Sequence, residues 1–298
     1  QFWGSLFSAL EPLPLIFCFW HIYLDAHQDG KPVANMPAFS FLLGSVVLEQ
    51  VGAGILGFTM TFALTNVWSH GTWVTLSHAH LALFGTFGML GLAAAYYAVP
   101  IMRGLAAFDQ RPGRLAFWLV FTGMLGLGFV FATGGTVQVF VYRTLGLDWF
   151  SGDVAPAMQF AKVSVPVFGM VFASGVGVLV YDLLTMGLRA PAAAGDEAAA
   201  VPRSAGWGRR LSGWETGLWL LAMWVFGGII TLGLLSFNLP SVQQGNALFP
   251  YLMAGIGYPG LLLTTLLFVR RFLRSLEARR HVPAAPLVVA AVSPAGAG

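Results

Sequence analysis

Apolar segments long enough to cross a bilayer follow one another along most of this chain. A membrane-spanning helix needs about 20 mainly apolar residues. The segments cover residues 2–27, 38–66, 72–102, 114–143, 156–188, 213–237 and 246–272. Because they lack the period-two alternation of transmembrane strands, the sequence predicts an all-α fold, a polytopic membrane helix bundle with about seven transmembrane helices.

The composition supports a membrane protein and excludes several other classes. Only 9% of the 298 residues are charged, whereas soluble domains carry about 25%. Cys18 is the only cysteine, which excludes an intrachain disulfide, a CxxCH haem-attachment site and a cysteine-based zinc motif. The net charge of +3 comes from basic residues between the apolar segments, so we interpret it as membrane topology and not as nucleic-acid binding.

The distribution of Lys and Arg over the loops predicts the orientation. Residues 67–71 and 238–245 contain no Lys or Arg, whereas residues 103–113, 189–212 and 270–280 contain several arginines. Basic loops stay on the cytoplasmic side. We therefore expect a multi-pass protein of the cell inner membrane, in contact with membrane lipid, with the N-terminus outside and the C-terminus in the cytoplasm.

Two histidines lie two positions apart in the third apolar segment, in the sequence Ser77-His78-Ala79-His80. At about 100° per residue, their side chains leave a regular helix about 200° apart, so each can bind a different centre but they cannot share one metal. Ionisable residues inside a membrane usually mark function, although both rings could simply be hydrogen-bonded in the bundle. Single histidines without thiolates suit haem iron better than zinc, and copper stays possible from ligand type.

Other polar residues surround this pair. Glu11 lies about nine residues, roughly 14 Å, into the first segment, in the same outer half of the membrane; it is expected to handle protons or lie near a metal, the alternative being a protonated acid bonded to a neighbouring helix. Glu49 falls near mid-membrane and could serve a proton route or a helix contact. His70 lies just outside the pair and could meet cofactor propionates or face water. Asp182 is expected to pair, and Tyr96 to anchor its helix at the headgroups.

A set of motifs in a fixed order then identifies a family. The motifs are Phe7-Ser8-Ala9-Leu10-Glu11-Pro12-Leu13-Pro14, Gly52-Ala53-Gly54, His70-Gly71-Thr72, His78-Ala79-His80-Leu81-Ala82 and Tyr97-Ala98-Val99-Pro100. Together they resemble the later part of the catalytic subunit of the nitric oxide reductases, the branch of the haem–copper oxidase superfamily that reduces NO. The resemblance is strong over residues 1–105 and weaker to about residue 190.

The resemblance implies a role for each matching residue. His78 would be the proximal ligand of high-spin haem b3 and His80 a ligand of low-spin haem b, while His70 would lie near the haem propionates. Glu11 would lie near the binuclear haem–non-haem iron site and its proton supply. The implied reaction is 2 NO + 2 e⁻ + 2 H⁺ → N2O + H2O, with quinol or cytochrome c as the electron donor.

The motif pattern also has departures. Ala79 replaces the glycine common in the family, and Glu49 stands where an apolar or small residue is expected. In the family, the ligands of the non-haem iron and the second axial histidine of haem b precede the Glu11 motif, and none is present here. We therefore expect a missing N-terminal region or another subunit to supply them, and no NO turnover by this chain alone.

The sequence predicts four regions and leaves several functions open. Residues 1–189 would form a haem-binding bundle of five helices, 190–212 a cytoplasmic linker, 213–280 two additional membrane helices, and 281–298 a disordered tail. The leading interpretation is the C-terminal part of an NO-reductase-like subunit. The alternatives are a related NO-dismutase-like or oxygen-reducing enzyme, a non-catalytic membrane haem-binding module, and a transporter that couples protons through Glu11 and Glu49.

Overall fold

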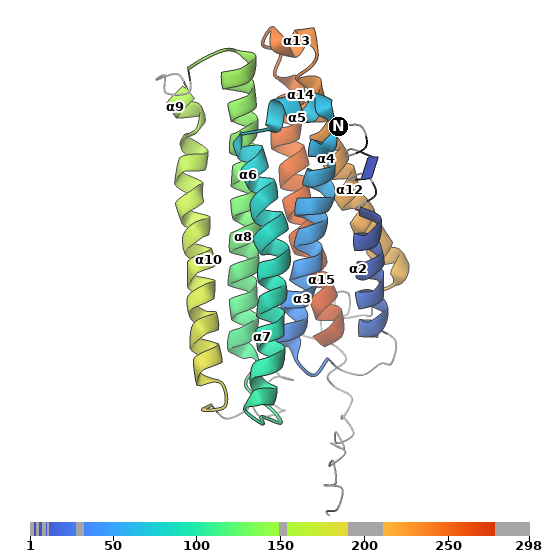
Figure 1. The fold of residues 1–298 in the computed structure, drawn as a ribbon, viewed down its shortest axis with the longest axis vertical. Coiled ribbons are helices and arrows are strands. Elements are labelled where there is room, and N and C mark those ends of the chain that lie inside the picture. The colour runs from blue at the N-terminus through green and yellow to red at the C-terminus, as the bar shows by residue number, and fades with distance from the viewer. Residues whose placement is uncertain are drawn as a thin grey trace, which may run out of the picture.

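Long helices, packed side by side along one direction, make up the molecule (Figure 1). The computed structural model describes residues 12–27, 33–148, 154–189 and 211–277, with isolated positions before residue 12. Every regular element in these ranges is a helix. The all-α prediction is therefore confirmed for the part of the chain that is described.

The first half of the chain forms helices that are interrupted by π-helical segments, labelled η, in which the helix is locally wider than an α-helix. The elements are α2 (Pro12–His27), α3 (Met36–Glu49), η1 (Gln50–Gly57), α4 (Phe58–Thr61), α5 (Ala63–Ser69), α6 (Trp73–Ala79), η2 (His80–Gly88), α7 (Met89–Met102), α8 (Arg111–Gln138) and η3 (Val139–Thr144).

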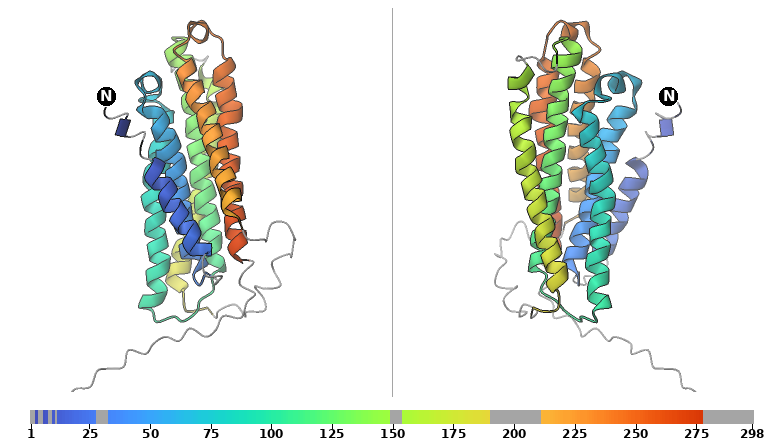
Figure 2. Two further views of the ribbon diagram at one scale, coloured as in Figure 1. Left: turned by 90° about the vertical axis from the view of Figure 1, so that its right-hand side faces the viewer. Right: turned by 60° about the vertical axis from the view of Figure 1, so that its left-hand side comes forward.

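The second half continues the same pattern. Its elements are α9 (Val154–Ala157), α10 (Gln159–Thr185), α12 (Gly213–Ser236), α13 (Pro240–Gln243), α14 (Leu248–Leu252), η4 (Met253–Gly257) and α15 (Tyr258–Glu277). In Figure 1 and in the right-hand view of Figure 2, α10 and α2 lie on different sides of the bundle.

Six continuous helices of the described chain are long and apolar enough to cross a membrane, which confirms six of the predicted segments. They are Met36–Thr61, Trp73–Met102, Arg111–Thr144, Ala155–Thr185, Gly213–Ser236 and Leu248–Glu277. Of the remaining predicted segment, 2–27, the 16-residue helix α2 is described. The predicted linker 190–212 and tail 281–298 lie almost entirely outside the described residues.

Aromatic side chains from different helices fill the core. Phe41 of α3 stacks on Tyr96 of α7, with ring centroids 5.5 Å apart, and meets Phe117 of α8 edge-on at 5.4 Å. Phe268 of α15 lies 5.4 Å from Phe19 of α2. These residues belong to one continuous hydrophobic core, so α12 and α15 pack into the same bundle as the helices that precede them.

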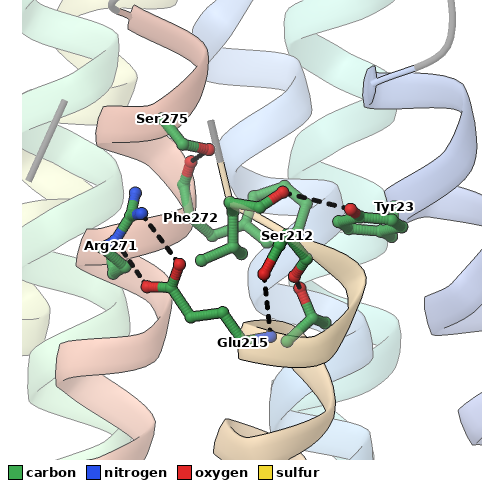
Figure 3. Close-up of polar contacts among 8 residues, drawn as sticks. Tyr23, Ser212, Glu215, Arg271, Phe272 and Ser275 are labelled. Atoms are coloured by element: carbon green, nitrogen blue, oxygen red, sulfur yellow. Dashed lines mark hydrogen bonds and ion pairs between the residues drawn. The ribbon is translucent and has the colours of Figure 1, made fainter. Parts of the chain in front are cut away.

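A buried ion pair joins the last two long helices (Figure 3). The guanidinium of Arg271 on α15 binds the Glu215 carboxylate of α12 with two hydrogen bonds, of 2.9 and 3.0 Å. Arg271 is only 4% exposed. Ser212 begins α12 by accepting a hydrogen bond from the Glu215 backbone N–H, and the Tyr23 hydroxyl of α2 donates to the Leu211 carbonyl at 3.1 Å. These contacts tie α2, α12 and α15 together at one end of the bundle.

A second buried polar group links α7 to α10. Asp182 accepts a hydrogen bond of 3.0 Å from the Tyr96 hydroxyl and forms an ion pair with Arg189. The predicted pairing of Asp182 is confirmed. Tyr96, in contrast, is fully buried, so its predicted position as a headgroup anchor is wrong: its hydroxyl satisfies a buried carboxylate instead of facing lipid headgroups.

Candidate functional site

His78 and His80 lie at a junction within one continuous helix. His78 is on the last turn of α6, and His80 begins η2. Thr72 starts this helix by accepting a hydrogen bond from the Val74 backbone N–H. Both histidines are half-buried, so neither is fully enclosed by the described part of the chain.

The ring of His78 is held by the neighbouring helix. Its Nδ1 lies 2.8 Å from the carbonyl oxygen of Gly52 in η1. A carbonyl only accepts hydrogen bonds, so Nδ1 carries the proton, and in the neutral ring Nε2 keeps its lone pair. Histidines that bind metals usually donate the other ring N–H in this manner, which fixes their tautomer and orientation.

The ring of His80 is held by its own helix. Its Nδ1 lies 2.9 Å from the carbonyl oxygen of Leu76, one turn earlier, so the same reasoning leaves Nε2 with its lone pair. The ring lies against Phe131 of α8, with centroids 5.0 Å apart. The two histidines therefore contact different helices, His78 on the α3–η1 side and His80 on the α8 side.

Glycines allow η1 to approach the histidine helix closely. A methyl group at Gly52 would lie 2.6 Å from the Ala82 backbone nitrogen, and one at Gly57 would lie 3.1 Å from Cε1 of His78. A side chain at Gly52 would require the backbone to move, and one at Gly57 would press on the His78 ring. Because π-helical turns are frequent at functional sites, the contact between η1 and η2 marks this region independently of the histidines.

The opposite side of the histidine helix is fixed by α8. The Ser77 hydroxyl donates a 2.7 Å hydrogen bond to the Gly128 carbonyl, and the Gln138 side chain accepts one of 2.7 Å from the Trp73 backbone N–H. A methyl group at Gly135 would lie 2.1 Å from the Val74 nitrogen. The backbone that carries both histidines is thus clamped between η1 and α8.

The outer loop with His70 is also well defined. His70 follows α5, is exposed, and connects through Gly71 to the start of α6. Gly71 has φ +73°, a left-handed conformation that glycine adopts readily. Arg143 of η3 donates to the carbonyls of Trp68 and His70, at 2.9 and 2.5 Å, so it caps the C-terminal end of α5. The sequence alone assigned no role to Arg143.

Glu11 and Glu49 are the two acidic residues that the sequence predicts near the site. Glu11 lies outside the described residues. Glu49 ends α3, half-buried, three residues before the carbonyl that holds His78. Next to it, Nε2 of Gln50 is buried and has no hydrogen-bond partner among the described residues. Gln50 borders a cavity of about 10 Å³, near the smallest volume that can hold one water.

The donor set fits haem better than a metal held by protein ligands alone. The described residues contain no group of three or more His, Cys, Asp or Glu placed to bind a metal ion. A porphyrin supplies the equatorial nitrogens itself and needs single axial imidazoles, which His78 and His80 can each provide through Nε2. From His80 onward, the apolar side chains Leu83 and Phe87 are 64% and 68% exposed, an apolar surface that suits a macrocycle or another helix.

Comparison with known proteins identifies the family. The family model described as cytochrome c and quinol oxidase polypeptide I matches residues 1–171, more than half of the chain. The chain belongs to this family. It is a multi-pass membrane protein of the haem–copper oxidases, whose members bind haems and a metal, and the predicted superfamily is confirmed.

One curated protein is similar to about half of this chain. A nitric oxide reductase subunit from Stutzerimonas stutzeri is 34% identical over 144 residues. The alignment covers 47% of this chain and 30% of that protein. The chain thus spans less than a third of the relative that it matches, in agreement with the predicted resemblance to one part of such a subunit.

Proposed function

We propose that this chain is the C-terminal part of a nitric-oxide-reductase-like subunit that reduces NO to N2O. The observation that carries the proposal is the pair of imidazoles on one helix. Each donates a hydrogen bond from Nδ1–H to a backbone carbonyl. The similarity to a relative that is named as a nitric oxide reductase supports the choice of NO among the substrates of the family.

In this proposal, each histidine holds one haem. Nε2 of His78 would bind haem b3 and Nε2 of His80 would bind haem b, as the family resemblance implies. Bound haems and a non-haem iron would supply the electron transfer and the site at which NO is reduced. The Gly52 and Leu76 carbonyls keep both rings in one tautomer and one orientation, so that little reorganisation is needed when a ligand binds.

The remaining predicted residues have supporting roles in the same proposal. Glu11 and Glu49 would handle the protons that NO reduction consumes. His70 would lie beside the propionates, at the outer end of the helix that follows it. The ligands of the non-haem iron would come from a segment or subunit outside this chain, and quinol or cytochrome c would donate the electrons.

Haem titration of the chain and its variants, assembled with the segment or subunit that supplies the second axial histidine of haem b, tests this proposal. We expect this assembly in detergent to bind two haems b, measured by pyridine haemochrome and electron paramagnetic resonance spectra. His78→Ala should remove the high-spin signal and keep the low-spin one, and His80→Ala should do the reverse. His21→Ala is the matched control, because His21 is exposed on α2 and should leave both signals unchanged.

Two outcomes would refute the assignment. If both alanine variants lost the same single centre, the histidines would not serve separate haems. If haem did not bind in a stoichiometric amount, His78 and His80 would not be haem ligands. The gas used by the complete enzyme, NO or oxygen, measured with selective electrodes, separates NO reduction from the oxygen-reducing alternative.

A further inference from the structure

A basic cavity lies at one end of the bundle, where α3 and α8 begin and α15 ends. Its volume is about 430 Å³, and the described residues that line it are Ser40, Arg114, Trp118, Arg270, Leu273, Arg274 and Glu277. Three arginines and one glutamate give this lining a formal charge of +2. We propose that this cavity binds the phosphodiester headgroup of an anionic phospholipid.

The spacing of residues on α15 directs one stripe of this helix toward the cavity. Leu273, Arg274 and Glu277 lie three, four and seven residues after Arg270, which places the four residues on the same helical face. The intervening Arg271 leaves the helix on another side and pairs with Glu215. The arginines of the stripe are therefore available to the cavity, while Arg271 holds α15 to α12.

The charges of the cavity are only partly neutralised. Arg114 and Glu277 form an ion pair of 2.8 Å, with side chains 28% and 22% exposed. Arg270 and Arg274 are exposed, and neither makes a hydrogen bond or ion pair with the described part of the chain. Guanidinium groups bind phosphate oxygens with two parallel hydrogen bonds, so this pair of arginines can bind one phosphodiester.

The position of the cavity favours a lipid over a soluble anion. Arg114 and Arg274 lie at the ends of membrane-spanning helices, the level at which headgroups lie. Trp118, one turn deeper on α8, is an interfacial residue type, and Leu273 adds apolar surface for an acyl chain. Basic pockets between helices at this level commonly bind anionic headgroups.

Lipid titration with native mass spectrometry tests the proposal directly. The full chain in dodecylmaltoside is titrated with dioleoylphosphatidylglycerol, with dioleoylphosphatidylcholine, or with the former plus millimolar inorganic phosphate. We expect one phosphatidylglycerol to bind more tightly than phosphatidylcholine, and phosphate not to displace it. Displacement by phosphate would assign the cavity to a soluble anion and overturn the lipid proposal, as would equal binding of the two lipids.

Substitutions locate the binding site. Each arginine contributes about 1 kcal/mol to the attraction for an anionic lipid, so the double variant Arg270→Gln/Arg274→Gln should bind phosphatidylglycerol about thirtyfold more weakly. The matched control is Arg111→Gln, an exposed arginine at the same end of the bundle that does not line the cavity. Its affinity should be unchanged. A loss of about fivefold in Arg111→Gln, equal to the loss per arginine in the double variant, would show a general charge effect and refute the site.

A third variant covers the case in which the double variant fails to fold, as monitored by circular dichroism. Glu277→Gln removes the acidic side chain of the described lining and raises its formal charge. Affinity for phosphatidylglycerol should then increase about fivefold, by the same contribution per charge. Unchanged or weaker binding by a folded Glu277→Gln variant would contradict the proposal.

Discussion

At the scale of single residues, a backbone carbonyl decides which nitrogen each histidine presents. The carbonyl for His80 belongs to Leu76, in its own helix, whereas the carbonyl for His78 belongs to Gly52, on another helix. The orientation of His80 therefore depends on its own helix and on the Phe131 ring of α8. The orientation of His78 depends on how closely η1 packs, so the two centres should differ in their sensitivity to changes in η1.

The substitution Gly52→Ala tests this dependence. The added methyl group would lie 2.6 Å from the backbone nitrogen of Ala82. Because this atom belongs to the backbone and not to a flexible side chain, the two helices must separate at η1. Overpacking of this kind costs about 1–3 kcal/mol. We expect a lower thermal unfolding midpoint by circular dichroism, together with a weaker or shifted signal from the centre at His78 and no change at His80.

Gly228→Ala is the control for this experiment. Gly228 lies within α12, and no atom lies within 4 Å of a methyl group placed there, so stability should change by less than about 1 kcal/mol. If Gly52→Ala altered both haem signals equally, or neither, the Gly52 carbonyl would not be specific to His78.

At the scale of elements, the helices were predictable but their π-helical segments were not. In the sequence, Gly52 and Gly57 do not differ from any other small residues that let membrane helices approach each other. A π turn differs from an α turn only in which carbonyl each N–H reaches, and no periodicity of apolar residues encodes that choice. One sequence signal could have indicated the close contact: these glycines cluster in the apolar segment that directly precedes the histidine helix.

Tyr96 and Tyr97 are neighbours that differ in burial, and the sequence does not reveal this difference. Tyr96 is fully buried, and Tyr97 is 64% exposed, yet both lie in the middle of α7, in a sequence that is apolar all round. In a membrane, an apolar helix gives little indication of which face packs on protein. The partner of Tyr96, Asp182, is 86 positions away, so only the three-dimensional structure identifies the contact.

The ion pair between α12 and α15 leads to a prediction at this scale. Removing one partner of a buried pair leaves the other charge without compensation and typically costs about 3–5 kcal/mol. Glu215 is 26% exposed, so solvent screening should reduce this cost to about 1–3 kcal/mol for Glu215→Gln or Arg271→Gln. The double variant should lose less stability than the sum of the single variants, measured by thermal unfolding in a double-mutant cycle.

Arg274→Gln, on the same helix as Arg271, is the control for the cycle. Its side chain is exposed, and in detergent without anionic lipid its replacement should change stability by less than about 0.5 kcal/mol. Additive effects of Glu215→Gln and Arg271→Gln would mean that the two helices are held by their apolar contacts and that the ion pair contributes little.

At the scale of the whole molecule, hydrophobicity and charge predicted the order and type of the elements. Each of the six confirmed spans coincides with an apolar segment that the sequence defined. That the histidine pair is a haem site stays a prediction, but its position within a membrane-spanning helix was predictable. The polar contacts between distant helices were not, since the sequence contains no signal for pairs such as Arg271 with Glu215 or Arg143 with the His70 carbonyl.

The orientation of the bundle is the last property that the sequence predicts, and it follows from charge alone. The arginines at the end of α15 and the start of α8 should face the cytoplasm, and the loop between α12 and α14 should face the outside. In a Cys18→Ser background, Gln244→Cys and Ala107→Cys place a single thiol at exposed positions in two opposite loops. A membrane-impermeant maleimide should label Gln244→Cys in intact cells, and Ala107→Cys only after permeabilisation. The reverse labelling pattern would place the basic cavity outside. The predicted position of the histidine pair in the outer half of the membrane would then be wrong as well, because both predictions depend on the same assignment of loops to sides.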